Sequence, residues 1–84
     1  MVIKEIAVGK DINSRDCALF VQHAMRYNSE ILLEFDTKKI NCKSVMGMIS
    51  LGLKIGDKVI MIIKGDDEEN AAGELALLFS SNFR

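Results

Sequence analysis

The chain has 84 residues, of which 49% are hydrophobic and 27% charged, and eleven basic against twelve acidic residues leave a formal net charge of −1. A chain of this length forms one small core, so we expect a single domain over residues 1–84 and no intrinsic disorder. The near-neutral charge argues against direct binding of nucleic acid through a broad basic surface. No apolar run reaches the roughly 20 residues that span a bilayer, and residues 1–5 lack signal-peptide features. We therefore expect a cytoplasmic protein without membrane contact.

The chain has two cysteines, Cys17 and Cys42, and a single histidine, His23. Two cysteines form at most one disulfide, and with one histidine they make no zinc-ligand cluster at a usable spacing. We expect two reduced and mostly buried thiols, no metal ion and no cofactor. A paired redox or metal role for the two thiols is the alternative.

A strand and a helix are predicted in the first third of the chain. Residues 2–8 contain β-branched side chains in imperfect alternation and predict a strand that ends at Gly9. Residues 11–14 indicate a turn and the start of a helix, and the apolar side chains of residues 17–27 fall at helical spacing. We expect His23 on the solvent side of this helix, about 15 Å from its start.

The middle of the chain predicts two strands and a short helix. Residues 31–35 indicate a strand, and residues 36–39 form a plausible hairpin connection to a second strand at residues 40–42. Ser44 opens an apolar segment over residues 45–53, where its hydroxyl is suited to cap a helix.

The last third predicts the most apolar strand and the last helix. Residues 58–64 are apolar enough for a central position in the sheet. The acidic residues 66–69 favour the positive end of the helix that follows, with Asp66 or Asp67 as its N-cap. The element order is thus β-α-β-β-α-β-α, which predicts an α+β fold with one antiparallel sheet and the helices on one face.

Residues 43–52, Lys-Ser-Val-Met-Gly-Met-Ile-Ser-Leu-Gly, resemble the regulatory segment of HPr, the phosphocarrier protein of the sugar phosphotransferase system. Residues 20–22 resemble the middle of the first HPr helix, residues 40–42 its third strand and residues 65–71 the start of its last helix. The resemblance extends over nearly the entire chain. It implies the HPr-like open-faced β-sandwich, with a four-stranded antiparallel sheet and three helices on one face in the order βαββαβα.

The segment before the first helix departs from the HPr pattern. In HPr a Gly-Ile-His-Ala-Arg-Pro-Ala segment contains the histidine that carries the phosphoryl group, and here residues 11–17 align with it. Asn13 occupies the histidine position and Asp16 the proline position. An amide nitrogen is no phosphoryl acceptor because its lone pair is delocalised, and a carboxylate repels a dianionic phosphate. We expect that Asn13 caps the helix with Asp16 as the acidic member of a capping box, and that phosphocarrier activity is lost.

Ser44 aligns with the HPr serine that a dedicated HPr kinase/phosphorylase phosphorylates in many Gram-positive bacteria. Phosphorylation would add about −2 charge at the positive end of a helix, which favours the helix. The resemblance therefore implies a switch that acts through surface charge with little refolding. Plain N-capping by Ser44 is the alternative interpretation.

The short helix after Ser44 is apolar over most of its circumference. The side chains suited to pack on the sheet are Met48, Leu51 and Leu53. The resemblance implies that the remaining apolar residues of this helix form a docking surface with two residues of the first helix. We define this docking surface as Arg15, Ala18, Val45, Met46 and Ile49. The alternative is a short helix that is buried on all sides.

These features favour a non-catalytic regulatory protein of the Crh-like type, an HPr-like protein without the active histidine. The expected partners are HPr kinase/phosphorylase and a catabolite-control-type regulator or another protein, with binding gated by phosphate on Ser44. Three alternatives stay open: a phosphocarrier with an unorthodox acceptor, a phosphorylation-independent interaction or self-association module, and an HPr-like domain that acts on an unrelated enzyme. The chain is expected to be a monomer or a homodimer.

Overall fold

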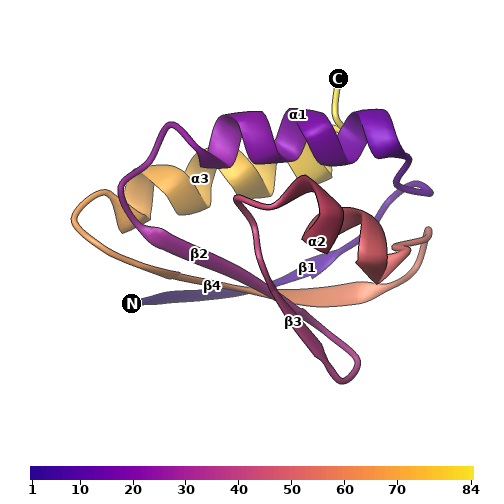
Figure 1. Ribbon diagram of the computed structural model, residues 1–84, viewed down its shortest axis with the longest axis horizontal. Helices are drawn as coiled ribbons and strands as arrows, with labels where there is room; N and C mark the ends of the chain where they lie inside the picture. The colour runs from indigo at the N-terminus through magenta and orange to yellow at the C-terminus, as the bar shows by residue number, and fades with distance from the viewer.

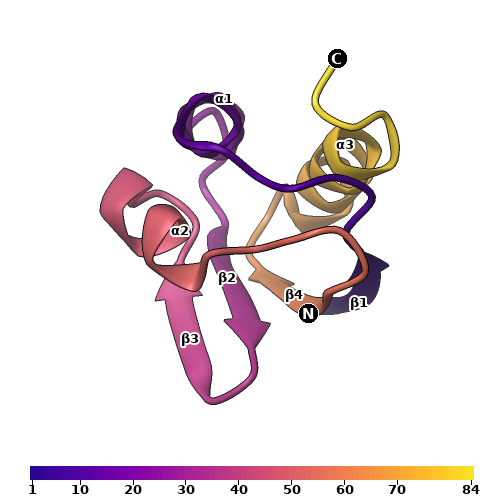
Figure 2. The same cartoon turned by 90° about the vertical axis from the view of Figure 1, so that its right-hand side faces the viewer.

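A computed structural model describes all 84 residues, and its elements follow the predicted order. They are β1 (Val2–Ala7), α1 (Ser14–Ala24), β2 (Glu30–Phe35), β3 (Lys38–Asn41), α2 (Val45–Leu51), β4 (Lys58–Lys64) and α3 (Glu68–Ser80). Figure 1 shows the three helices on one side of the sheet, and Figure 2 shows that nothing lies against the other side. The predicted α+β fold is confirmed.

The sheet has the strand order β1-β4-β2-β3, and all its neighbouring strands are antiparallel. β4 is an inner strand, as its apolar sequence predicts, and Val59, Met61 and Ile63 point from it into the core. The two edge strands contribute least to the core. β1 buries one side chain fully, and β3 buries none.

The core lies between the sheet and the helices, and aromatic side chains connect α1 with the C-terminal part of the chain. The rings of Phe20 and Phe79 have centroids 5.2 Å apart, and those of Phe79 and Phe83 are 5.1 Å apart, both in edge-on geometry. Such edge-to-face pairs add about 0.5–1.5 kcal/mol beyond the burial of their area. They hold α3 and the tail against α1.

Two helices end earlier than the apolar pattern of the sequence predicted, and backbone conformation explains the end of α2. α2 ends at Leu51 because Gly52 adopts the left-handed conformation with φ of 58°, which costs little without a Cβ atom. Leu53 therefore lies beyond the helix, although it is buried as predicted. α1 ends at Ala24, three residues before the last apolar residue of the pattern, and Tyr27 packs against the core from the following turn.

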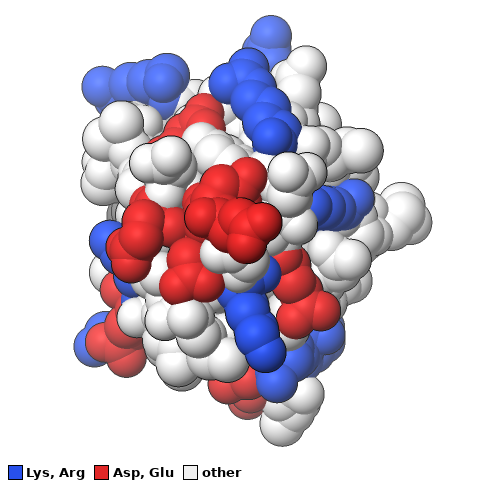
Figure 3. Space-filling model, turned by 90° about the vertical axis from the view of Figure 1, so that its left-hand side faces the viewer, with Lys and Arg blue, Asp and Glu red and all other residues white.

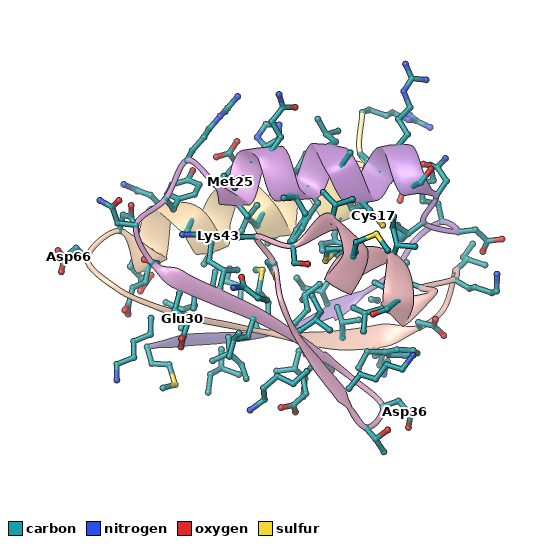
Figure 4. The ribbon with its side chains drawn as sticks, viewed as in Figure 1. Cys17, Met25, Glu30, Asp36, Lys43 and Asp66 are labelled. Atoms are coloured by element: carbon teal, nitrogen blue, oxygen red, sulfur yellow. The ribbon has the colours of Figure 1, made fainter.

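The cysteines are reduced and buried, as expected. Figure 4 shows Cys17 on the side of α1 that faces the rest of the fold. Burial, together with the neighbouring Asp16 carboxylate, raises the pKa of the Cys17 thiol, and burial alone raises that of Cys42. Neither thiol is therefore activated at neutral pH. The structure has no group of three His, Cys, Asp or Glu side chains that could hold a metal ion, and no helix long and apolar enough to cross a membrane.

The acidic run at the start of α3 acts differently from the N-cap that the sequence predicted. Figure 3 shows acidic side chains gathered at this end of the molecule. Asp67 is the N-cap residue, but its side chain makes no capping bond. Its carboxylate instead accepts hydrogen bonds from the Ser29 hydroxyl and from the backbone N–H groups of Asn28 and Ser29, and these bonds lower the pKa of Asp67. Asp67 thus ties the α1–β2 loop to α3.

The expectation that His23 faces solvent is wrong. His23 lies in the seam between α1 and α3, where its Nδ1 donates to the carboxylate of Glu74. The same carboxylate accepts a hydrogen bond from the Tyr27 hydroxyl, and Arg26 lies 3.4 Å from it. The Tyr27 hydrogen bond, followed by the His23 contact and the Arg26 charge, lowers the pKa of Glu74. One carboxylate of α3 thus binds three side chains from the end of α1 and the turn that follows it.

We predict that Glu74→Gln lowers the free energy of unfolding at pH 7 by about 1 kcal/mol, because a partly exposed, charge-assisted network is lost. A carboxyl whose folded pKa is depressed stabilises the fold above its unfolded pKa, and this contribution is lost as pH falls through the folded value. Urea unfolding of the parent and the variant between pH 7 and pH 3 should therefore converge at the acid end. Glu5→Gln, at an exposed position of β1, is the control. A stability difference that is independent of pH would contradict the prediction.

Candidate functional site

The predicted docking surface lies on two neighbouring helices, α1 and α2, which pack against each other. Arg15 and Ala18 are exposed on α1. On α2 the exposed fractions are 38% for Val45, 75% for Met46 and 42% for Ile49. The prediction that these three apolar side chains lie outside the core is confirmed, and the alternative of a fully buried α2 is wrong.

The opposite side of α2 packs on the sheet as predicted. Met48 and Leu51 are buried, and Leu53 is buried just beyond the helix. A helix of seven residues has room for only two or three inward side chains, so the other apolar residues remain at the surface. The apolar sequence of α2 therefore produces an exposed cluster as well as a buried one.

Ser44 caps α2. Its backbone is extended, with φ of −117° and ψ of 115°, and its Oγ accepts a hydrogen bond from the Gly47 N–H at 3.0 Å. A Cβ atom on Gly47 would lie 3.3 Å from this Oγ, so glycine allows the close approach of hydroxyl and helix. Ser44 is half-buried, directly before the exposed Val45 and Met46.

The neighbouring Lys43 has a partner that the sequence did not indicate. Its ammonium donates to the carbonyl oxygen of Tyr27 at 2.7 Å, just beyond the end of α1. Figure 4 shows Lys43 below α1, in the segment that leads from β3 to α2. The ammonium is thus held at the end of α1, away from the exposed face of α2.

The start of α1 has the predicted reciprocal capping box. The backbone N–H of Asp16 donates to Asn13 Oδ1 at 2.8 Å, and the backbone N–H of Asn13 donates to Asp16 Oδ2 at 3.2 Å. Asn13 therefore acts as the N-cap. The Asp16 side chain is only 9% exposed, and its Oδ2 also lies 2.7 Å from the ammonium of Lys10. Lys10 was not predicted, because a lysine in a loop belongs to no periodic pattern.

A pocket of about 330 Å³ opens between the start of α1 and the C-terminal tail. Its lining residues are Lys10, Asn13, Arg15, Asp16, Leu19 and Phe83. Asp16 neutralises Lys10 inside this pocket, while Arg15 is exposed and forms no ion pair. Phe83 was also missed by sequence analysis, and only the return of the tail over α1 places it here.

The amide and carboxylate groups that line the pocket are engaged within the chain. The Asn13 amide is no nucleophile, and its oxygen already accepts a hydrogen bond in the cap. The Asp16 carboxylate is the one lining group with an ionised oxygen, and it accepts the Asn13 backbone N–H and pairs with Lys10. The adjacent Cys17 thiol is buried with a raised pKa, and His23 is engaged by Glu74 between α1 and α3. We call the start of α1 closed, because the side chains of Asn13 and Asp16 make its capping bonds and Lys10 pairs with Asp16. It lies near the exposed apolar cluster on α2.

Comparison with protein-family models gives a match over residues 4–81 to the PTS HPr component phosphorylation site. Among curated proteins, the HPr-like protein Crh of Bacillus subtilis is 43% identical over 72 residues, which cover 86% of this chain and 85% of that protein.

Solved structures show the same similarity. The crystal structure of HPr-C-His from Thermoanaerobacter tengcongensis superposes with a TM-score of 0.85 at 44% identity, covering 98% of this chain and 92% of the other. The crystal structure of Bacillus subtilis Crh, described as a dimer with a swapped domain, superposes with a TM-score of 0.76 at 39% identity. That match covers 99% of this chain and 97% of the other.

We predict that Asp16→Ala lowers the free energy of unfolding by about 1–2 kcal/mol, because it removes one member of the capping box and leaves Lys10 without its partner. Ser14→Ala, at an exposed position of the same turn, should change stability by less than about 0.5 kcal/mol. Chemical denaturation of the parent and both variants measures the difference. Equal stability of the two variants would show that the Asp16 contacts contribute nothing.

Proposed function

Because the chain belongs to the HPr family, we propose that it is a non-catalytic, Crh-like regulatory protein that binds partner proteins and carries no phosphate on histidine. The observation that carries this proposal is the closed start of α1. There Asn13, aligned with the carrier histidine of HPr, is the N-cap, and Asp16 pairs with Lys10. Crh of Bacillus subtilis, one of the relatives with similar sequence, is named as an HPr-like protein.

The electrostatics of the pocket support the loss of carrier activity. A phosphoryl group delivered to this position would approach the buried carboxylate of Asp16, and at about 5 Å the repulsion is roughly 1–3 kcal/mol for each unit of phosphate charge. Lys10 cannot offset this repulsion freely, because its ammonium already lies 2.7 Å from the same carboxylate. A phosphocarrier with an unorthodox acceptor is therefore the weaker candidate.

The docking surface is the proposed binding site for a partner protein. Val45, Met46 and Ile49 form an exposed apolar cluster, and Arg15 on the adjacent helix has a guanidinium without an internal partner. Apolar contacts with methionine adapt readily to a partner, and an arginine can bind a carboxylate with two hydrogen bonds. We expect a catabolite-control-type regulator, or another protein with an apolar and partly acidic site, to bind here.

Phosphorylation of Ser44 by an HPr kinase/phosphorylase is the proposed gate for this binding. A phosphate at Ser44 would lie beside Val45 and Met46 and would keep the N-capping position through its own oxygens. Lys43 is bound to the Tyr27 carbonyl, so it does not neutralise that phosphate without giving up its own hydrogen bond. The phosphate charge is thus left for cationic side chains of the partner.

Self-association is a second candidate function, and one observation favours it. The crystal structure of the Bacillus subtilis Crh relative is described as a dimer with a swapped domain. This chain superposes on that structure over 99% of its length and has two edge strands, so a homodimer that works without phosphorylation is compatible with the fold. The two functions are not exclusive for a dimer through the edge strand β1, which lies at the opposite edge of the sheet from β3 and α2.

If phosphate on Ser44 controls binding, the phosphorylated chain should bind a catabolite-control-type regulator at least about tenfold more tightly than the unmodified chain. Charge-assisted contacts to the phosphate contribute about 1.5–3 kcal/mol. The measurement is calorimetric titration after treatment with HPr kinase/phosphorylase. Ser44→Ala should remove the gain, and Ser50→Ala, which alters an exposed hydroxyl of the same helix, should retain it. Equal affinity of both forms of the chain would remove Ser44 from the proposal.

The closed start of α1 predicts that Enzyme I and phosphoenolpyruvate add no phosphate to the chain. Intact mass spectrometry after incubation should show the unmodified mass. The double variant Asn13→His with Asp16→Pro should gain one phosphate, at least about tenfold faster than Asn13→His alone, because the repelling carboxylate is then absent. A stoichiometric gain by the parent chain would overturn the proposed loss of carrier activity.

A further inference from the structure

β4 is apolar on both faces, although helices cover only one of them. Val59, Met61 and Ile63 point into the core, and Ile60 and Ile62 point to the uncovered side of the sheet. Strands with one solvated face usually alternate between apolar and polar side chains, and strands apolar on both sides are typically buried on both sides. The sequence of β4 is therefore typical of a strand whose two faces are both covered.

The register extends this pattern across the uncovered face. Ile3 of β1 pairs with Ile62 of β4, which pairs with Leu32 of β2, so three aliphatic side chains form one row across three strands. Ile60 lies beside this row. Ile3 is 63% exposed, and Leu32, Ile60 and Ile62 are half-buried. We call these four residues the aliphatic row. Contiguous apolar patches on small monomers usually mark an interaction site.

Charged residues surround the aliphatic row in equal numbers of each sign. The alternation of side chains and the register place them on the same uncovered face. They are Glu5, Glu30, Glu34, Lys39, Lys58 and Lys64. Figure 4 shows Glu30 at the start of β2, on this side of the sheet.

The two signs are arranged so that the face is complementary to itself. Glu5 on the edge strand β1 and Lys39 on the opposite edge strand β3 lie at the same level, because Glu5 pairs with Ile60, Ile60 with Glu34 and Glu34 with Lys39. Lys64 on β4 lies level with Glu30 on β2. A twofold axis that runs along the strands, midway between β4 and β2, exchanges β4 with β2 and β1 with β3.

We propose that a second copy of this chain covers the open face of the sheet, related by this twofold axis. Ile62 then meets Leu32 of the second copy, Lys64 meets its Glu30, and Glu5 meets its Lys39, each contact occurring twice. Ile60 meets the methylene groups of Glu34, whose carboxylate lies 3.5 Å from Lys39 within its own chain. Ile3 meets Asn41 of the second copy, because the register places these two residues at the same level. Aligned face-to-face packing of this kind is the usual arrangement of two antiparallel sheets.

The size of the open face of the sheet sets the expected affinity of the dimer. Four strands about 4.8 Å apart, with about six residues each rising about 3.3 Å, give a face of roughly 19 by 20 Å. The resulting area of about 400 Å² is smaller than the roughly 800 Å² that each partner contributes to a stable interface. The dimer is therefore weak and reversible, with a dissociation constant of about 0.1–1 mM. This dimer keeps all four strands in their own chain, so it exchanges rapidly, unlike one formed by a swapped segment.

The sharpest test uses Glu5 and Lys39, which are exposed and lie on opposite edges of the sheet, so neither contacts the other within one chain. Glu5→Lys alone places like charges together at both ends of the interface, and so does Lys39→Glu alone. Each variant should dimerise at least about tenfold more weakly than the parent. An equimolar mixture of the two variants restores both opposite-charge contacts, so its heterodimer should return to within about threefold of the parent affinity.

Sedimentation equilibrium from 20 µM to 2 mM measures these affinities, and circular dichroism verifies that each variant is folded. Ile62→Lys should abolish association, and Met46→Lys on α2 should leave it unchanged. A parent chain that stays monomeric at 2 mM would overturn the proposal, as would variants that do not recover on mixing or a dimer that Met46→Lys dissolves. Because this face is separate from the docking surface, neither result decides the proposed regulatory function.

Discussion

One carboxylate organises the start of α1. The Asp16 carboxylate accepts a hydrogen bond from the Asn13 backbone N–H and lies 2.7 Å from the Lys10 ammonium, while the Asp16 backbone N–H donates to Asn13 Oδ1. These contacts satisfy the backbone N–H groups of Asn13 and Asp16 with groups from the chain itself. The Asp16 carboxylate also places a negative charge at this helix end, which repels an external anion, and this repulsion is the physical basis for proposing a regulatory rather than a carrier role.

The two candidate interaction surfaces have a common physical origin. With only 84 residues, the chain buries too small a fraction of its surface to cover every apolar side chain it contains. α2 is too short to turn all its apolar residues inward, so Met46 remains exposed beside Ser44. The three helices cover one face of the sheet, so Ile3 and Ile62 remain on the other. Partner proteins and a second copy of the chain would cover the apolar side chains that the small core leaves exposed.

Aromatic packing and one carboxylate hold α1 against α3 along the seam between them. Phe20 and Phe79 pack edge to face in its middle, and the Glu74 carboxylate binds His23 and Tyr27 at the end of α1. This end is distant from the pocket at the start of the same helix. His23 therefore has a structural role, and its engagement by Glu74 keeps the only imidazole of the chain away from any phosphoryl chemistry at Asn13.

The amino-acid sequence was enough to predict the order of elements, the central position of β4, the caps at Asn13 and Ser44, and the division of α2 into buried and exposed sides. These features depend on residues within about one turn of each other or on the period of apolar side chains, which a sequence displays directly. The contacts of His23 with Glu74, 51 residues away, and of Lys43 with the Tyr27 carbonyl, 16 residues away, became visible only in the folded chain. Such polar contacts follow no period, because they arise where packed helices and loops bring distant residues within hydrogen-bond distance.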